Sequence, residues 1–135
     1  MVVHQQTYRR LPELAEFIAR NLTFVDHVAF MGLEITGFTR ANLGSLWIDP
    51  FDYQSELCEA VLLLDAHRMR VSVYNHQRCV LDRQLWQFAR KSISDWKNEY
   101  MAECGGCAEM ERCRGFFSSA RLRHSDHIQP IPFAS

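Results

Sequence analysis

The sequence lacks the features that mark several common classes of protein. It has no internal repeat, no low-complexity segment and no apolar run approaching the ~20 residues of a membrane-spanning helix. The segment from Met1 to Arg10 contains no signal-peptide core. The net charge is only −1 at pH 7, so no overall field favours nucleic acid or an anionic membrane. We therefore expect a soluble, cytoplasmic protein without a membrane partner, and we do not expect nucleic acid as its partner.

Two enzyme signatures are also missing. The sequence contains neither a glycine-rich phosphate-binding loop nor a serine nucleophile motif. Its bulk composition, with 47% hydrophobic and 23% charged residues, is close to that of ordinary globular domains. A chain of 135 residues suits one domain, or part of one.

The first half of the chain alternates between strand and helix patterns. Strands are predicted at residues 2–3, 25–33 and 70–74, and helices at residues 11–21 and 51–68. In the first helix we expect Leu14, Phe17 and Ile18 to share the apolar face. In the second helix we expect Leu57, Val61 and Leu64 to do so. Residues 34–50 are predicted to form a long loop. Loops of this length inside a compact domain are usually functional or disordered. This order predicts parallel strands joined by right-handed helical crossovers.

Three parallel strands and two helices do not complete a closed fold. A whole (β/α) barrel needs far more chain, because each βαβ unit takes ~30 residues or more. Three strands also leave two open sheet edges. Residues 2–3 look like the end of a strand that starts before the chain does. We therefore expect either part of a larger fold or a small open sheet, with another chain or a second copy of this one at the open edge.

The five cysteines are the most informative residues. An odd number without a secretion signal argues against a disulfide framework. Cys104 and Cys107 form a CxxC turn around two glycines, Cys113 follows five residues later, and Cys79 lies upstream. Thiolates grouped in this way suit zinc or an iron–sulfur cluster. Cys58 lies on a predicted helix beside Leu57, and we expect it to be a packed thiol.

Several interpretations of this cluster remain open at this level. A structural zinc site with four cysteine ligands is the strongest rival of an iron–sulfur cluster, although zinc ribbons typically pair two CxxC turns and this chain has one. A redox CxxC is another, but such a motif normally follows a strand and opens a helix. Free, buried cysteines are the simplest alternative.

The region around these cysteines resembles a known family. Cys79, Trp86, the run Ser92-Ile93-Ser94-Asp95-Trp96-Lys97-Asn98, the CxxC-x5-C pattern and Gly115-Phe116 are similar to the C-terminal region of radical S-adenosylmethionine (SAM) enzymes. The resemblance is closest to the radical SAM maturases of His-Xaa-Ser peptide-modification systems. It extends back through Tyr74 and Asn75 and through residues 31–34, and so covers nearly the whole chain.

The resemblance implies an α/β fold in which a partial (β/α) barrel, here about three parallel strands and two helices, precedes an irregular cysteine-rich region. It implies three segments: the C-terminal half of the barrel at residues 1–75, an auxiliary-cluster region at residues 76–117 and an extended tail at residues 118–135. The ligands of one auxiliary 4Fe–4S cluster would be Cys79, Cys104, Cys107 and Cys113. The CxxxCxxC motif of the SAM-cleaving cluster is absent from the sequence. We therefore do not expect this chain to cleave SAM alone.

The resemblance also implies a ligand face. In this family, strand ends help to bind SAM, and the matching residues here are Gly32, Glu34 and Asn42. SAM would bind only together with an N-terminal barrel half, and the partner would be a ribosomally made precursor peptide undergoing maturation. The alternative is a small α/β binding module with a structural four-cysteine zinc site that recognises a protein or nucleic acid.

Overall fold

The computed structural model describes residues 1–91 and 98–134 of the chain. Three parallel strands form an open sheet in the order β1 (Val2–Val3), β2 (His27–Gly32) and β3 (Arg70–Tyr74). In the register of the sheet, Met31 lies between Val2 and Tyr74. The mixed α/β architecture with three parallel strands is thus as the sequence predicts.

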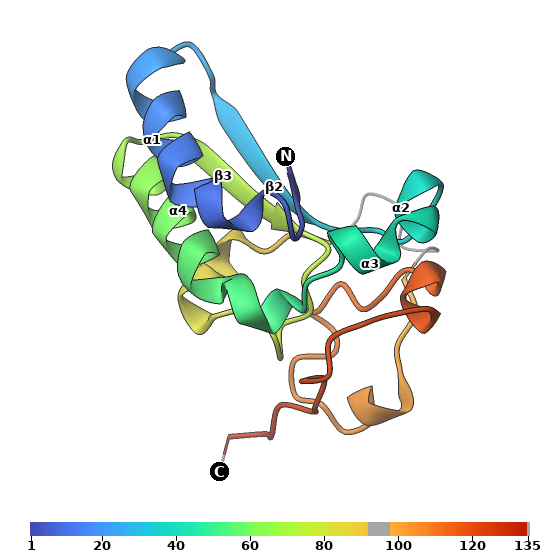
Figure 1. Cartoon of the computed structure of the whole chain (residues 1–135). Helices are drawn as coiled ribbons and strands as arrows, with labels where there is room; N and C mark the ends of the chain where they lie inside the picture. Colours follow the sequence, from blue (N-terminus) through green and yellow to red (C-terminus); the bar gives the residue numbers. More distant parts are fainter. Residues whose placement is uncertain (92–97, 135) are drawn as a thin grey trace.

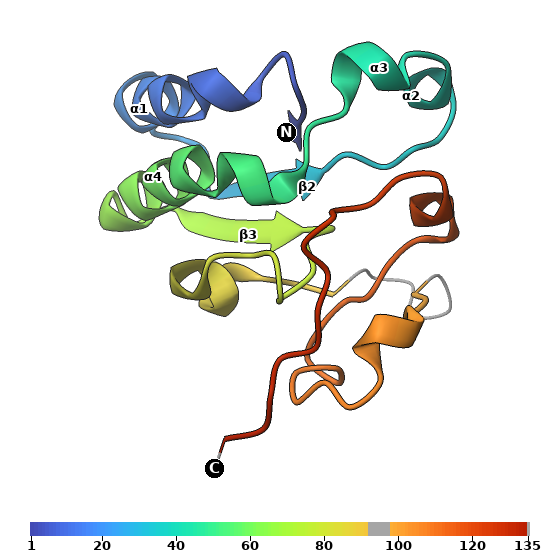
Figure 2. The ribbon, with the colours of Figure 1, turned by 60° about the horizontal axis from the view of Figure 1, so that its bottom comes forward.

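Helices α1 (Leu11–Asn21) and α4 (Gln54–Ala66) pack side by side on one face of this sheet (Figures 1 and 2). The predicted stripe of Leu57, Val61 and Leu64 is fully buried. The core is completed by the alternate strand residues that face these helices, which are Val28, Phe30, Val71 and Val73.

The predicted apolar face of α1 is correct for Ile18 and wrong for Leu14 and Phe17. Leu14 and Phe17 are 37% and 53% exposed, and the buried positions are Leu11, Ala15, Ile18 and Ala19. These four buried residues also follow the spacing expected for one face of a helix. Its two alanines allow α1 to approach α4 closely, and this pairing is not apparent from hydrophobicity alone.

The segment between β2 and α4 contains more structure than the loop predicted there. It forms two single-turn helices, α2 (Phe38–Ala41) and α3 (Leu43–Leu46), and then a 3₁₀ helix at Pro50–Tyr53. The Asp49 side chain accepts a hydrogen bond from the Phe51 N–H and caps that 3₁₀ helix. The α-helix therefore begins at Gln54 instead of residue 51.

The two edges of the sheet differ. At the β3 edge, Ala89 forms a parallel bridge with Val73, and a 3₁₀ helix at Arg83–Phe88 packs beneath the sheet (Figure 2). The Asp82 side chain caps this 3₁₀ helix by accepting a hydrogen bond from the Gln84 N–H. At the other edge β1 pairs with β2 alone among the described strands, and Val2 is 44% exposed.

The rest of the chain is irregular and lies beside the carboxyl ends of the strands (Figure 2). It contains short 3₁₀ helices at Ala102–Cys104 and Ser118–Arg121, together with an antiparallel bridge between Glu99 and Phe116. The tail then runs back past the 3₁₀ helix that precedes α4. Residues 92–97 of the motif that carries the family resemblance lie outside the described residues, whereas Asn98 lies within them.

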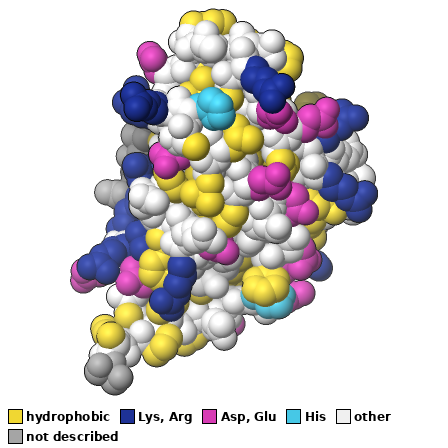
Figure 3. Space-filling model, turned by 90° about the vertical axis from the view of Figure 1, so that its left-hand side faces the viewer, with side chains coloured by type: hydrophobic (Ala, Val, Ile, Leu, Met, Phe, Trp, Pro, Cys, Tyr) yellow, Lys and Arg dark blue, Asp and Glu magenta, His cyan; other side chains and the backbone are white. Residues whose placement is uncertain are grey.

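No helix in the described part of the chain combines the length and the apolar character needed to cross a membrane. Over the centre of the face drawn in Figure 3, basic, acidic and apolar side chains are interspersed, as expected for a net charge near zero.

Candidate functional site

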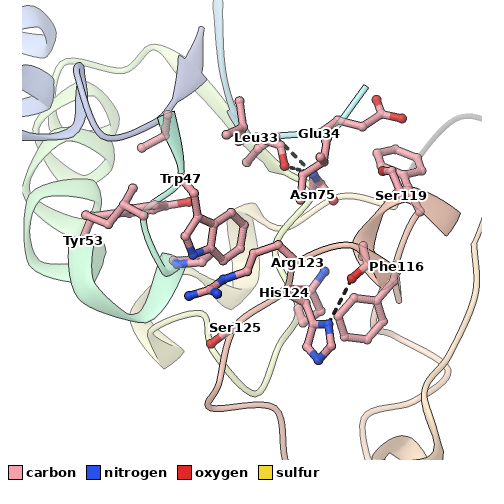
Figure 4. A pocket seen from close by; sticks show the side chains of 18 residues that line it. Leu33, Glu34, Trp47, Tyr53, Asn75, Phe116, Ser119, Arg123, His124 and Ser125 are labelled. Atoms are coloured by element: carbon pink, nitrogen blue, oxygen red, sulfur yellow. Dashed lines mark hydrogen bonds between the residues drawn. The ribbon is translucent and has the colours of Figure 1, made fainter. Parts of the chain in front are cut away.

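A cavity lies where the three strands end. It measures about 480 Å³ including its open mouth. Its wall comes from the strand ends, from the loop before α4 and from the tail, with Glu34, Trp47 and Arg123 among the lining residues (Figure 4). The Arg123 guanidinium lies over the Trp47 ring at 5.6 Å from its centroid. Parallel α/β folds place their ligands at this end of the strands.

The predicted SAM contacts are only partly brought together. Gly32 and Glu34 line the cavity, and the Glu34 carboxylate points away from Trp47 and Tyr53 (Figure 4). Asn42 is not among the described residues of that wall. Its side-chain amide instead donates to the Phe38 carbonyl at 2.8 Å, which ends helix α2.

Gly32 is needed for close packing of the backbone. A Cβ at this position would lie 2.3 Å from the Asn75 carbonyl oxygen. The Asn75 side chain also holds these two segments together, because its amide donates to the carbonyl oxygens of Gly32 and Leu33 at 3.0 and 3.3 Å. The family resemblance implies that Gly32 lies on the SAM face, whereas the close neighbour of Gly32 here is Asn75, in the segment that follows β3.

A buried hydrogen-bonded pair lies behind the cavity. Tyr53 is 1% exposed and His76 is 3% exposed, and their side chains meet at 2.6 Å. Since His76 Nδ1 lies 2.8 Å from the Tyr74 carbonyl, it carries the proton, and Nε2 accepts from the Tyr53 hydroxyl. Burial lowers the pKa of His76 to about 4, and the charge of Arg114 also lowers it.

This pair predicts a loss of stability in mild acid. The unfolded chain binds a proton at His76 near its ordinary pKa of 6.5, whereas the folded chain does so only near 4. Stability is therefore full above about pH 7 and declines as the pH falls through this window, by about 2 kcal/mol at pH 5. Urea unfolding at several pH values measures this change. The variant His76→Gln should have a flatter pH profile, and an unchanged profile would contradict the assignment.

The four predicted metal ligands line a second cavity. Cys79, Cys104, Cys107 and Cys113 surround a space of about 330 Å³, including its mouth. The rest of the lining is largely apolar or aromatic and includes Met110, Phe116 and Ile131. Cys58 is elsewhere, buried in helix α4, as the sequence predicts.

Backbone N–H groups are directed at the sulfurs of all four cysteines. Cys113 Sγ accepts from Arg78 and Gly115, each at 3.5 Å, and Cys107 Sγ accepts from Ile131 at 3.3 Å. Two further backbone groups bond to the remaining pair, Gln129 to Cys79 and Met101 to Cys104. Such donors stabilise the negative charge of a thiolate.

The chemistry of Cys58 is different. Burial raises the pKa of the Cys58 thiol to about 11, and the nearby carboxylate of Asp82 raises it further. Burial likewise raises the pKa of Cys79 and Cys104, and neighbouring cysteines add to the effect, but backbone N–H groups oppose it at both sulfurs. Backbone N–H groups thus oppose the effect of burial at Cys79 and Cys104, whereas at Cys58 the Asp82 carboxylate adds to it.

The four sulfurs share a cavity without converging on one point. Within residues 1–91 and 98–134, no three His, Cys, Asp or Glu side chains are placed to hold a single metal ion. Four thiolates on one zinc ion would have to lie about 3.8 Å apart, given Zn–S bonds of about 2.3 Å. In a 4Fe–4S cluster each thiolate binds a different iron, so the sulfurs are spread more widely around the cluster.

A buried arginine joins the two cavities. Arg114, next to Cys113, donates to Asn75 Oδ1 at 2.8 Å and to Asn98 Oδ1 at 3.0 Å. Its guanidinium also lies 3.9 Å from the centroid of the Phe117 ring. Because Asn75 holds the end of β2, this network links the strand ends to the cysteine loop. The sequence analysis did not identify Arg114 as a functional residue. The only sequence signal for it is its position directly after Cys113, the last cysteine of the CxxC-x5-C pattern.

Comparison of the chain with protein-family models, with curated proteins and with solved structures finds no match.

Proposed function

We propose that this chain is the C-terminal part of a radical SAM peptide-modifying maturase that binds one auxiliary 4Fe–4S cluster. The ligands are Cys79, Cys104, Cys107 and Cys113. The observation that carries the proposal is that these four sulfurs, and not that of Cys58, surround one largely apolar cavity and accept backbone N–H groups.

In a 4Fe–4S cluster each of the four thiolates binds a different iron, so the four sulfurs need not converge on one ion. When bound, such a cluster supplies one-electron chemistry. Four cysteine ligands leave no iron open to a substrate, which favours relay of an electron over anchoring of the peptide.

The strand-end cavity forms part of the SAM and peptide face in this proposal. Its support is the position of Gly32 and Glu34 at the carboxyl ends of parallel strands, where (β/α) barrels carry out their chemistry. Asn42 contributes less, because it lies outside that wall. The exposed edge of β1 is the surface that an N-terminal barrel half would complete, and the cytoplasm is the compartment that suits an oxygen-sensitive cluster.

The test is the metal content and the visible spectrum of the full chain purified without oxygen. We expect about four irons per chain and a broad brown absorption that dithionite bleaches. One tightly bound zinc and no colour, persisting after anaerobic reconstitution with iron and sulfide, would overturn the proposal. That result would favour the small binding module with a structural zinc site.

A further inference from the structure

The C-terminal tail closes the cysteine cavity. Gln129 and Ile131 are lining residues of that cavity, together with the four cysteines. Their backbone N–H groups bond to the sulfurs of Cys79 and Cys107, which come from separate segments of the chain. The tail thus contributes to the cavity although it contains no cysteine.

The sequence of this segment explains why its donors face the sulfurs. Gln129 and Ile131 alternate with Pro130 and Pro132. A residue that precedes proline is biased to an extended conformation, in which alternate N–H groups point to the same side. Proline has no N–H, so the intervening positions present no unpaired donor on the opposite side.

The segment is held at both ends. Beyond the cavity, the Ala108 N–H donates to the Ile131 carbonyl at 2.8 Å. Upstream, the Asp126 N–H donates to Asp49 Oδ2 at 3.0 Å, and the His127 ring stacks on Phe51 at 3.7 Å between centroids. These contacts fasten the tail across the loop before α4 and onto the cysteine loop.

We propose that residues 129–131 are the closing element of the metal centre, which position two of its sulfurs, set its reduction potential and shield it from solvent. This inference rests on the proposed 4Fe–4S cluster. Reduction adds negative charge to a cluster and its ligands, and N–H donors to the sulfurs stabilise that charge. Without the donors of the tail, the reduced state is disfavoured and the potential moves to more negative values.

The sharpest test replaces one donor. Ile131→Pro removes the N–H that bonds to Cys107 and keeps an apolar side chain, whereas Ile131→Val keeps the N–H and serves as the matched control. Iron content and an anaerobic redox titration followed by electron paramagnetic resonance are measured on the full chain. We expect full iron in both variants, a more negative midpoint potential in Ile131→Pro and the wild-type potential in Ile131→Val.

A second variant keeps the inference testable if Ile131→Pro takes up no iron. Truncation after Ile128 removes the closing segment but retains the contacts of Asp126 and His127. We expect its visible absorption to bleach in air several-fold faster than that of the wild type. A wild-type potential in iron-loaded Ile131→Pro, or a wild-type bleaching rate in the truncated chain, would overturn the inference. Absence of iron from the wild type itself would instead overturn the proposed function.

Discussion

Replacement of Cys104 or Cys113 by serine is expected to abolish the iron–sulfur spectrum and to reduce the iron content from about four per chain to near zero. The reason is that each thiolate binds its own iron, and both sulfurs lie on the wall of the same cavity. Residues 98–117 contribute no side chain to the main hydrophobic core, so they should also lose protection from hydrogen exchange. Hydrogen exchange should rise across residues 98–117 far more than across residues 11–68.

Cys58→Ser provides the matched control for this experiment. Cys58 is also buried, but it lies in α4 against Asp82 and away from the four clustered sulfurs. Its variant should retain full iron and the wild-type spectrum. Loss of iron on replacing Cys58, or retention of iron on replacing Cys104, would show that the ligand set is wrong.

Gly32→Ala is expected to lower the free energy of unfolding by about 3 kcal/mol, at the upper end of the usual cost of overpacking. The added methyl carbon would lie 2.3 Å from the Asn75 carbonyl oxygen, which is backbone and cannot rotate away. Relief would require the end of β2 to separate from the segment after β3. That movement would also disturb the Asn75 to Arg114 contact at 2.8 Å. Urea or thermal unfolding measures the effect.

Gly44→Ala is the control for the glycine experiment. Nothing lies within 4 Å of a Cβ at Gly44, and the residue is in the short helix α3. Alanine favours a helix over glycine by up to about 1 kcal/mol, so this variant should be as stable as the wild type or slightly more stable. Equal losses in the two variants would argue against the close contact at Gly32.

The sequence by itself determined the order and type of the main elements. Helix α1 was predicted with its observed bounds of Leu11 and Asn21, and strand β3 with its bounds of Arg70 and Tyr74. Apolar spacing and capping residues act over a few neighbouring positions, so the helices and strands that they specify can be recognised in a single sequence. The same holds for the CxxC-x5-C pattern, which singled out three of the four cysteines that line the cavity, Cys104, Cys107 and Cys113.

Only the tertiary structure decided which groups meet the functional side chains. The Ile131 N–H reaches Cys107 from 24 positions away, and Arg114 reaches Asn75 from 39 positions away. Gly32 and Asn75 are drawn together because β2 and β3 are parallel neighbours, and the buried face of α1 was set by its pairing with α4. Such contacts depend on how distant segments pack against one another. Local propensity and residue spacing do not encode that packing. The packing of distant segments alone places the tail over the cysteines.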